Sequence, residues 1–396
     1  MSEPNVVLTI PRPGEVKLKE RPHPKIVPGF ALVKVRIAPI CIEHQIYKDF
    51  SFEWMEDKDN MGHEGVGEIC EVAAGSRFNV GDRVIIYQGH PCGQCYVCTS
   101  GLSPTHCMRV PYEKMVAGST IEGIEDSGDG SNTLQTLGEM GVGRRAIEIE
   151  CGSDGGGFGF GRFRIAPEIM IQKIPDSLDF RYAASANCAL GCTYTGIEEL
   201  GVGPGDFVLV AGIGFIGFGA IINARYRGAK VIALGRNEYR MEQARNIGAD
   251  YVLNPEDPDW LEKLRDITGY RQGADYAAEC SGYPYYQSKC IAAVRRYGGV
   301  FFFGHVPGAD HKLEIHILDE IMNRHVHLTG GHDVRWLHRE GLVNMLQDAH
   351  VQKGIDKMVT HEFNMSDGKA AFEAALSKKA GKIYLYPWED CPQAGH

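Results

Sequence analysis

The chain of 396 residues carries 41 Lys and Arg against 51 Asp and Glu, a formal net charge of −10. Nucleic-acid phosphates are bound by clustered basic side chains, so this balance argues against a nucleic-acid partner. No apolar run reaches the roughly 18 residues that span a bilayer, and no basic-then-apolar segment opens the chain. We therefore expect a cytoplasmic protein without a membrane partner, and at this length we expect two domains.

The first hundred residues predict a small, mostly β domain. Runs in which apolar residues alternate with polar ones lie at 31–40, 65–74 and 81–88, and a Gly-Asp turn begins the last of them. That alternation is typical of half-buried strands. From 108 to 153 the chain is rich in Gly, Ser and acidic residues and loses its periodicity. This change indicates either an inserted loop or lid, or a disordered surface excursion.

Four cysteines lie just before that segment. The chain has 12 cysteines, and without an export signal we expect a reducing compartment, where clustered thiols favour metal over disulfides. The spacing C-x2-C-x2-C-x8-C is formed by Cys92, Cys95, Cys98 and Cys107. Four thiolates complete a tetrahedral site with no open position, so we predict a structural zinc in a lobe over 90–108. An iron–sulfur cluster uses the same ligands, but nothing else in the sequence suggests electron transfer.

From 189 onward strands and helices alternate, which predicts a parallel sheet covered by helices. The segment GIGFIG at 212–217 directly follows the first strand and begins the next helix. Three glycines in that place permit a tight turn, the close approach of a pyrophosphate and close helix–strand packing. The alternative is a glycine-rich turn without a ligand. We predict a dinucleotide loop formed by Gly212, Gly214, Phe215, Ile216 and Gly217.

The end of the second strand bears on which nicotinamide cofactor is used. Gly235 stands where an NAD site usually has Asp or Glu, and Arg236 follows it. A guanidinium can pair bidentately with a 2′-phosphate, so NADP(H) is expected in preference to NAD(H). The alternative is that Arg236 stacks on adenine or faces solvent, and Glu238 is close enough to oppose a phosphate.

In their order along the chain these features resemble the medium-chain zinc-dependent alcohol dehydrogenases. The likeness covers about 25 to 386 and includes Cys41, GHEGVG at 62–67, the four cysteines, DGG at 154–156 and GIGFIG. It implies an α/β fold in which a GroES-like β-barrel catalytic domain accompanies a Rossmann domain with a doubly wound parallel sheet. We expect the catalytic domain over 1–188 and 326–396, and the Rossmann domain over 189–325. The resemblance also implies a homodimer or homotetramer.

The resemblance further implies a catalytic zinc with a position open to substrate. Carried over by motif, its ligands are Cys41, His63 of the Gly-His-Glu motif, and a cysteine before the Rossmann domain. Two cysteines qualify, Cys188 and Cys192, and the family pattern fits without gaps if Cys188 is used. Glu64 is then the neighbouring carboxylate that can approach or transiently bind the metal. Taken singly, a buried cysteine is usually a core residue.

The proton path departs from the family pattern. Relatives have Ser or Thr two residues after the first cysteine, Asp three after, and often His five after. Here Glu43, His44 and Ile46 occupy those places, so the hydroxyl relay and the carboxylate that orients the zinc-bound histidine are both expected to be missing. Three interpretations follow. Glu43 acts as general base alone or with His44, Glu43 becomes a zinc ligand, or the site no longer oxidises alcohols.

The leading hypothesis is a zinc-dependent oxidoreductase that transfers a hydride between NADP(H) and an alcohol or carbonyl substrate, with Glu43 and His44 replacing the usual relay. One alternative is an NAD(P)H-dependent reductase of an activated C=C or C=N bond that makes little use of zinc. Another is a catalytically silent nucleotide-binding protein. Zinc content separates them, because only the first hypothesis requires both a catalytic and a structural ion.

Overall fold

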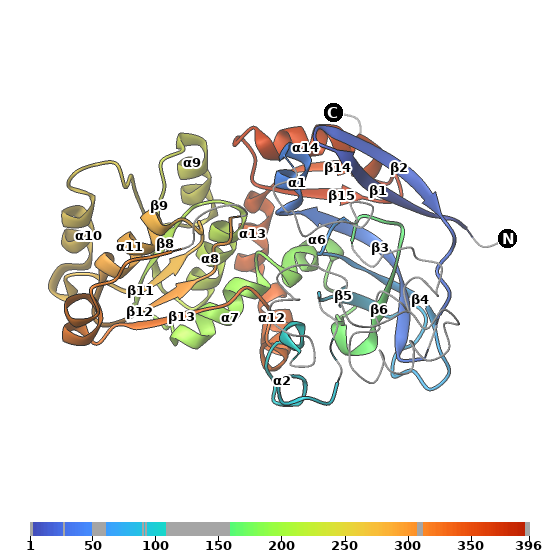
Figure 1. The fold of residues 1–396 in the computed structure, drawn as a ribbon, viewed down its shortest axis with the longest axis horizontal. Coiled ribbons are helices and arrows are strands. Elements are labelled where there is room, and N and C mark those ends of the chain that lie inside the picture. The colour runs from blue at the N-terminus through green and yellow to red at the C-terminus, as the bar shows by residue number, and fades with distance from the viewer. Residues whose placement is uncertain are drawn as a thin grey trace.

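The computed structural model describes residues 3–26, 28–49, 61–88, 91, 93–107, 159–306 and 312–392. Cys92, the expected insertion over 108–153 and the DGG segment at 154–156 lie outside this part of the chain. Within it, no helix is both long and apolar enough to cross a membrane. The described residues form two bodies, one on each side of a central group of helices (Figure 1).

The first body is built from both ends of the chain around a seven-stranded sheet with the path β14-β15-β3-β4-β5-β7, to which β6 adds beside β3. Its long strand β3 is buried along most of its length, and its side chains contribute to several of the apolar clusters. A separate hairpin is formed by β1 (Asn5–Arg12) and β2 (Glu15–Arg21). The strands of the sheet are β3 (Phe30–Ile40), β4 (Val66–Val72), β5 (Arg83–Ile86), β6 (Phe163–Pro167), β7 (Ile171–Lys173), β14 (Val359–Asn364) and β15 (Lys382–Tyr386).

One strand pairing in this body positions the site. Strand β15 runs antiparallel to β3, with Ile383 opposite Ile40. This register sets Lys382, the first residue of β15, beside the end of β3, where Cys41 follows. The two ends of the chain therefore meet at the place where the sequence predicts metal ligands.

The second body is a six-stranded, wholly parallel sheet with the order β10-β9-β8-β11-β12-β13. The strand order reverses between β8 and β11, and ligands of such sheets bind beyond the carboxyl ends of the strands at that point. Because β13 is the sixth strand, the sheet continues to Gly330, past the expected domain boundary at 325. Its strands are β8 (Phe207–Ala211), β9 (Lys230–Leu234), β10 (Tyr251–Leu253), β11 (Ala274–Glu279), β12 (Val294–Phe302) and β13 (His327–Gly330).

Helices cover both faces of this sheet and join it to the barrel (Figure 1). Several begin with a capping side chain; Asn237, for example, accepts a hydrogen bond from the backbone N–H of Arg240 at the start of α9. The helices are α1 (Glu43–Asp49), α2 (Tyr96–Thr99), α6 (Phe180–Ala183), α7 (Gly191–Leu200), α8 (Phe215–Tyr226), α9 (Glu238–Ile247), α10 (Trp260–Thr268), α11 (Pro284–Ala293), α12 (Arg339–Leu346), α13 (Ala349–Met358) and α14 (Gly368–Leu376).

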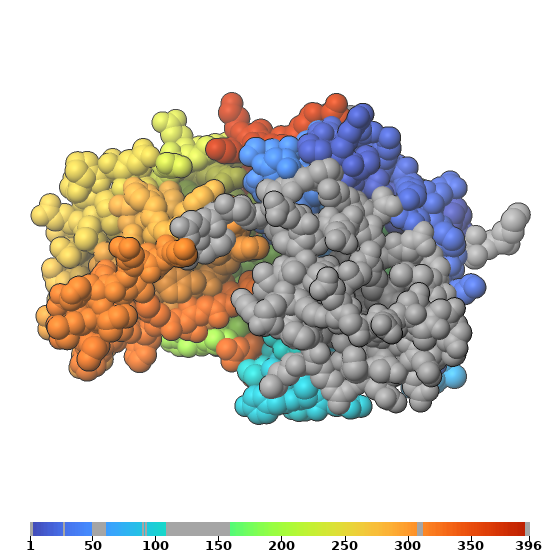
Figure 2. All heavy atoms as spheres, in the orientation of Figure 1, coloured from blue at the N-terminus to red at the C-terminus, as the bar shows by residue number. Residues whose placement is uncertain are grey.

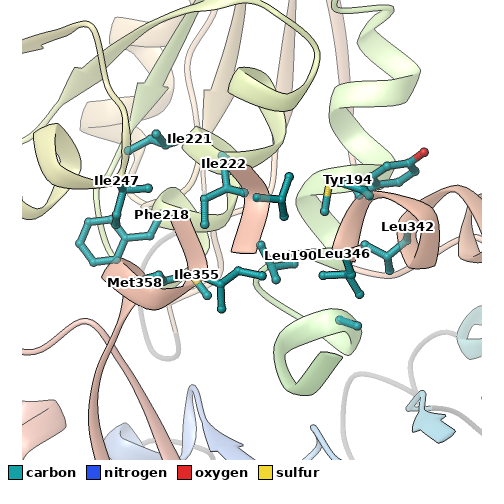
Figure 3. Packing of buried hydrophobic residues seen from close by; sticks show 14 of the residues in the cluster. Leu190, Tyr194, Phe218, Ile221, Ile222, Ile247, Leu342, Leu346, Ile355 and Met358 are labelled. Carbon is teal, nitrogen blue, oxygen red and sulfur yellow. The ribbon is translucent and has the colours of Figure 1, made fainter. Parts of the chain in front are cut away.

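The largest apolar core lies between α8 and the helices packed on it (Figure 3). Phe218 of α8 is fully buried there with Ile355 and Met358 of α13. Helix α8 also lies against the segment before α7, because a Cβ on Gly219 would come 1.9 Å from the carbonyl oxygen of Ala189. Only glycine permits that approach, which fixes the helix of the nucleotide loop against the residue after Cys188.

The four-cysteine lobe stands apart from these cores. Its described residues, 93–107 in cyan, form the lower edge of the molecule in the space-filling view (Figure 2). The lobe is attached to the chain after β13 by two backbone hydrogen bonds, from Trp336 N to Leu102 O at 3.2 Å and from Leu337 N to Gly101 O at 3.1 Å.

Replacing Phe218 by Ala should lower the free energy of unfolding by about 3–5 kcal/mol, because the change removes a fully buried ring and leaves a cavity between α8 and α13. Tyr226→Ala on the same helix is the matched control, since Tyr226 is 40% exposed and surface changes usually stay within about 0.5 kcal/mol. Denaturant titration of both variants measures the difference. Equal losses would show that this core does not stabilise the fold as described.

Candidate active site

Four side chains from distant parts of the sequence converge where β3 ends. Cys41 follows β3, His63 and Glu64 precede β4, and Cys188 follows the short helical turn over Ala184–Asn187. Their ligand atoms all lie within 4.8 Å of one another. The sulfur atoms of Cys41 and Cys188 are 3.6 Å apart, close to the roughly 3.8 Å that two thiolates have on a tetrahedral zinc with bonds of about 2.3 Å. The donor set therefore fits a zinc ion.

Cys192, the other candidate, is one helical turn further along α7. Its thiol donates a hydrogen bond to the carbonyl oxygen of His332, with sulfur and oxygen 2.7 Å apart. It is not among the four converging groups. The geometry thus favours Cys188 over Cys192 as the third protein ligand.

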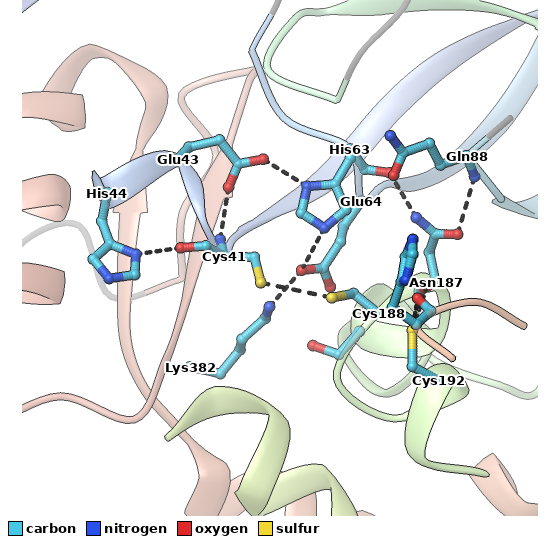
Figure 4. A network of polar contacts seen from close by, with 12 residues as sticks. Cys41, Glu43, His44, His63, Glu64, Gln88, Asn187, Cys188, Cys192 and Lys382 are labelled. Carbon is cyan, nitrogen blue, oxygen red and sulfur yellow. Dashed lines mark hydrogen bonds and ion pairs between the residues drawn. The ribbon is translucent and has the colours of Figure 1, made fainter. Parts of the chain in front are cut away.

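Glu43 lies behind His63 and contacts it directly (Figure 4). Its Oε1 accepts a hydrogen bond from His63 Nδ1 at 2.7 Å, and its Oε2 accepts one from the backbone N–H of Cys41 at 2.8 Å. The side chain is 2% exposed. Burial acts to raise the pKa of Glu43, but the His63 ring and the backbone donors outweigh it and hold the pKa at about 2. The carboxylate is therefore ionised, and it directs His63 Nε2 toward the other ligands.

This contact corrects one expectation. The sequence suggested that no carboxylate orients the metal-binding histidine, because position 44 is His where relatives have Asp. Glu43 reaches His63 from one position earlier, with the one extra methylene that a glutamate has. Both carboxylate oxygens of Glu43, which the sequence suggested as a general base, therefore accept hydrogen bonds.

His44 points away from His63 and toward the nucleotide loop. Its Nδ1 contacts the carbonyl oxygen of Cys41, and its Nε2 lies 2.9 Å from the side-chain nitrogen of Gln45. Its ring stands edge-on to Phe215, with centroids 5.8 Å apart. Burial lowers the pKa of His44, against the raising effect of the Cys41 carbonyl and Glu43. Ile46, the third departure from the family pattern, is a buried core residue.

A buried lysine that the sequence reasoning missed completes this site. Lys382 Nζ forms an ion pair with Glu64 Oε1, and both side chains are 0% exposed. Glu64 Oε2 is also buried and has no hydrogen-bond partner among the described residues, so this oxygen remains available to a metal. The ammonium lies 5.6 Å from the Phe215 ring of the nucleotide loop. The signal was a lysine at the start of the apolar run KIYLY, which the sequence alone could not place.

The lobe holds a second group of thiols. Cys95 Sγ lies 3.5 Å from Cys98 Sγ and 3.8 Å from Cys107 Sγ, and the three sulfur atoms are within 4.8 Å of one another. These distances again suit thiolates around one zinc. Cys92, the fourth predicted ligand, lies outside the described residues.

The nucleotide loop has the geometry that the glycines predict. Gly212 has φ of +89° and sits directly against Ser281, while Gly217 is so close to Gly212 O that a Cβ would lie 2.2 Å from it. Gly214 caps α8, whose first residues are Phe215 and Ile216. At the end of β9, a Cβ on Gly235 would lie 2.4 Å from the side chain of Ile213. An acidic residue has no room there without a shift of Ile213.

Two arginines lie near this loop in different environments. Arg236 is 66% exposed, with its nearest acid, Glu256, at 3.3 Å. Arg240, in the first turn of α9, has a buried Nε without a hydrogen-bond partner among the described residues. Its Nη1 lies 3.6 Å from the point where a Cβ of Gly214 would be. Burial lowers the pKa of Arg240. A basic residue in a first helical turn, where acids are favoured, was the signal that the sequence reasoning overlooked.

Comparisons with known proteins agree with this architecture. The family model for the alcohol dehydrogenase GroES-like domain matches residues 27–176, and that for zinc-binding dehydrogenases matches residues 216–340. Sorbitol dehydrogenase of Halalkalibacterium halodurans is 27% identical over 379 residues, 94% of this chain and 96% of that protein. L-threonine 3-dehydrogenase of Pyrococcus horikoshii is 28% identical over 397 residues, 97% of this chain and 99% of that protein.

Solved structures share the fold. Alcohol dehydrogenase from Thermus sp. ATN1 superposes with a TM-score of 0.76 at 22% identity, covering 96% of this chain and 99% of that one. A zinc-binding dehydrogenase from Sinorhizobium meliloti bound to NADP gives 0.73 at 20% identity, covering 98% and 100%. With both family models matched in the expected order and the donor groups in place, the chain belongs to the zinc-dependent medium-chain dehydrogenase family of oxidoreductases.

Proposed function

We propose that this protein transfers a hydride between NADP(H) and a hydroxyl- or carbonyl-bearing substrate at a zinc held by Cys41, His63 and Cys188. The observation that carries the proposal is the convergence of these donors beside the nucleotide loop. His44 packs against Phe215 of that loop, and Lys382 lies within 5.6 Å of the same ring. Curated relatives named for sorbitol and L-threonine support a hydroxyl-bearing substrate.

Three protein ligands leave the fourth position of a tetrahedral zinc open, as in catalytic sites of this metal. Zinc bound there would polarise a carbonyl or lower the pKa of an alcohol toward neutrality. Glu64 stands beside that position, with one oxygen held by Lys382 and the other without a hydrogen-bond partner in the described part of the chain. A second zinc held by Cys92, Cys95, Cys98 and Cys107 would stabilise the lobe.

Glu43 is assigned here to positioning His63. Its two hydrogen bonds and near-complete burial support this role, because a general base must reach the proton that it removes. His44 is then the member of the expected relay that remains. With Nδ1 donating to the Cys41 carbonyl, His44 Nε2 accepts a hydrogen bond from the Gln45 side-chain amide, so it can take a proton once Gln45 turns away, and its ring borders the nucleotide loop.

The preference for NADP(H) rests on Arg240 more than on Arg236. A buried guanidinium without an acidic partner is costly unless a ligand supplies the counter-charge. Arg240 is partly buried, its Nε is buried without a hydrogen-bond partner among the described residues, and its Nη1 lies against Gly214, whereas Arg236 is exposed and close to Glu256. The missing acid at Gly235 removes repulsion against a 2′-phosphate. Arg240 is therefore our candidate for the group that binds the additional phosphate.

We also propose that the protein is a homodimer or homotetramer. The segment before β13 exposes large apolar side chains on the surface of the second body. Ile317 is 57% exposed, Leu318 53% and Met322 60%. Exposed apolar groups gathered in one segment mark an association surface.

The first prediction concerns metal and reaction together. We expect two zinc ions per chain, one of which is lost in Cys98→Ser while the other is lost in His63→Ala. Elemental analysis measures the zinc count. A screen of secondary alcohols, polyols and their ketones with NADP(H) measures activity. Only His63→Ala should abolish activity by removing the catalytic zinc. A wild-type enzyme with one zinc, confined to the lobe, would contradict the proposal and favour a reductase of activated double bonds.

The second prediction concerns Glu43. Glu43→Gln keeps the length of the side chain but removes the charge that orients His63, so we expect metal affinity at the Cys41 site to fall about 10- to 100-fold, the usual effect of losing such a partner. Competition with a chromophoric chelator measures it. Glu373→Gln, at an exposed acidic residue on α14, is the control. Unchanged zinc affinity with lost activity would instead identify Glu43 as the base.

The third prediction separates the two arginines. Arg240→Gln should reduce kcat/KM for NADPH about 10- to 100-fold and leave NADH nearly unaffected, since a hydrogen bond to a charged group contributes about 1.5–3 kcal/mol. Arg236→Gln should change either value little. Steady-state kinetics with both cofactors provide the comparison. Equal losses with NADPH and NADH would place Arg240 on the pyrophosphate, which both cofactors share.

A further inference from the structure

A third group of metal-type donors lies outside the two zinc sites. His106 is the last residue of the short helical turn over Pro104–His106 in the lobe, while His332 and Asp333 follow β13 of the parallel sheet. One ligand atom from each of the three lies within 4.8 Å of the others. The two imidazole rings stand edge to face with centroids 5.2 Å apart. The group thus joins the lobe to the sheet that carries the nucleotide loop.

The donors converge on one carboxylate oxygen. His106 Nε2 contacts Asp333 Oδ2, and His332 Nε2 lies 3.9 Å from the same atom. That oxygen is buried, and its contact with His106 is an ion pair. A cation could take the place of the proton shared by His106 and Asp333, because a metal accepts the same lone pairs, and His332 would supply the third donor.

The identity of the donors points to the kind of ion. Two imidazoles and one carboxylate are ligands that zinc accepts, at about 2.0–2.2 Å each. Asp333 is 13% exposed, His106 40% and His332 67%. One side of the group is therefore open to solvent, and water can complete the coordination. The exposed His332 is free to turn toward the ion by the small amount that the present 3.9 Å separation requires.

We propose that His106, His332 and Asp333 bind a third, exchangeable zinc ion that ties the lobe to the chain after β13. The backbone already holds the two segments together through the bonds from Trp336 and Leu337 to the lobe, so little ordering is needed on binding. The ion would also restrain the backbone of His332, whose carbonyl accepts the Cys192 thiol. Cys192 lies one turn from Cys188, so an ion at the third site would restrain a residue next to the catalytic zinc ligands.

Calorimetric titration of the full-length protein with Zn²⁺, after dialysis against a weak chelator that spares tightly held zinc, tests the site. Wild type should take up one more ion than His332→Ala, or bind it at least about tenfold more tightly. Even the loss of a residue that only hydrogen-bonds to a metal ligand usually lowers metal affinity by about that factor. Asp333→Asn should weaken binding as well. His327→Ala, which removes an exposed imidazole on the preceding strand β13, should titrate like wild type.

Thermal unfolding gives a second measurement. Excess Zn²⁺ should raise the Tm of wild type and of His327→Ala but not that of His332→Ala, because an ion that binds only the folded state stabilises it. His332 is largely exposed, so its replacement leaves folding intact. Equal zinc uptake and equal Tm shifts in wild type and His332→Ala would overturn the proposal and leave His106 and Asp333 as a simple ion pair. Neither result depends on enzymatic activity or on which cofactor is used.

Discussion

The buried ion pair between Glu64 and Lys382 joins the two ends of the chain at the centre of the site. Both groups are completely removed from water, and the loss of one partner in such a pair typically costs about 3–5 kcal/mol because the other charge remains buried. Burial opposes the charge on Lys382, but Glu64 and the neighbouring thiols of Cys41 and Cys188 raise its pKa and keep it protonated. The pair requires β15 to lie against β3 in one register, which also fixes Cys41.

Around this pair the site is layered by charge. The thiols and the imidazole of His63 lie on one side, where a divalent cation would be balanced by thiolates and by Glu64. Lys382, Arg240 and the edge of His44 border the nucleotide loop on the other side, where a dinucleotide brings phosphates. Lys382 thus lies beside the metal donors and Arg240 beside the phosphate loop, so cationic side chains border both parts of the site.

How far the sequence could predict this arrangement depends on the range of each contact. Motifs carried in short segments were readable: the thiols of the lobe, the glycines of the loop, and Cys41 with His63. The parallel sheet was predicted from strand–helix alternation, and the family of the chain is confirmed by the matched family models. Lys382 was not readable, because its partner is 318 residues away and only the β15–β3 register brings them together. The contact between Glu43 and His63 was missed because position alone does not reveal how far a side chain reaches. Arg240 was missed because solvent exposure is invisible in a sequence.

The contact between Glu43 and His63 also bears on how this site could evolve. In the usual pattern the hydroxyl and the orienting carboxylate occupy two adjacent positions. Here Glu43 at the first position contacts His63, while His44 at the second packs against Phe215 of the nucleotide loop. Conversion in either direction by single steps passes through a poor intermediate. A serine at 43 alone would leave His63 without its anion, and an aspartate at 44 alone would crowd two carboxylates onto one ring. We therefore expect the effects of substitutions at 43 and 44 to depend on each other.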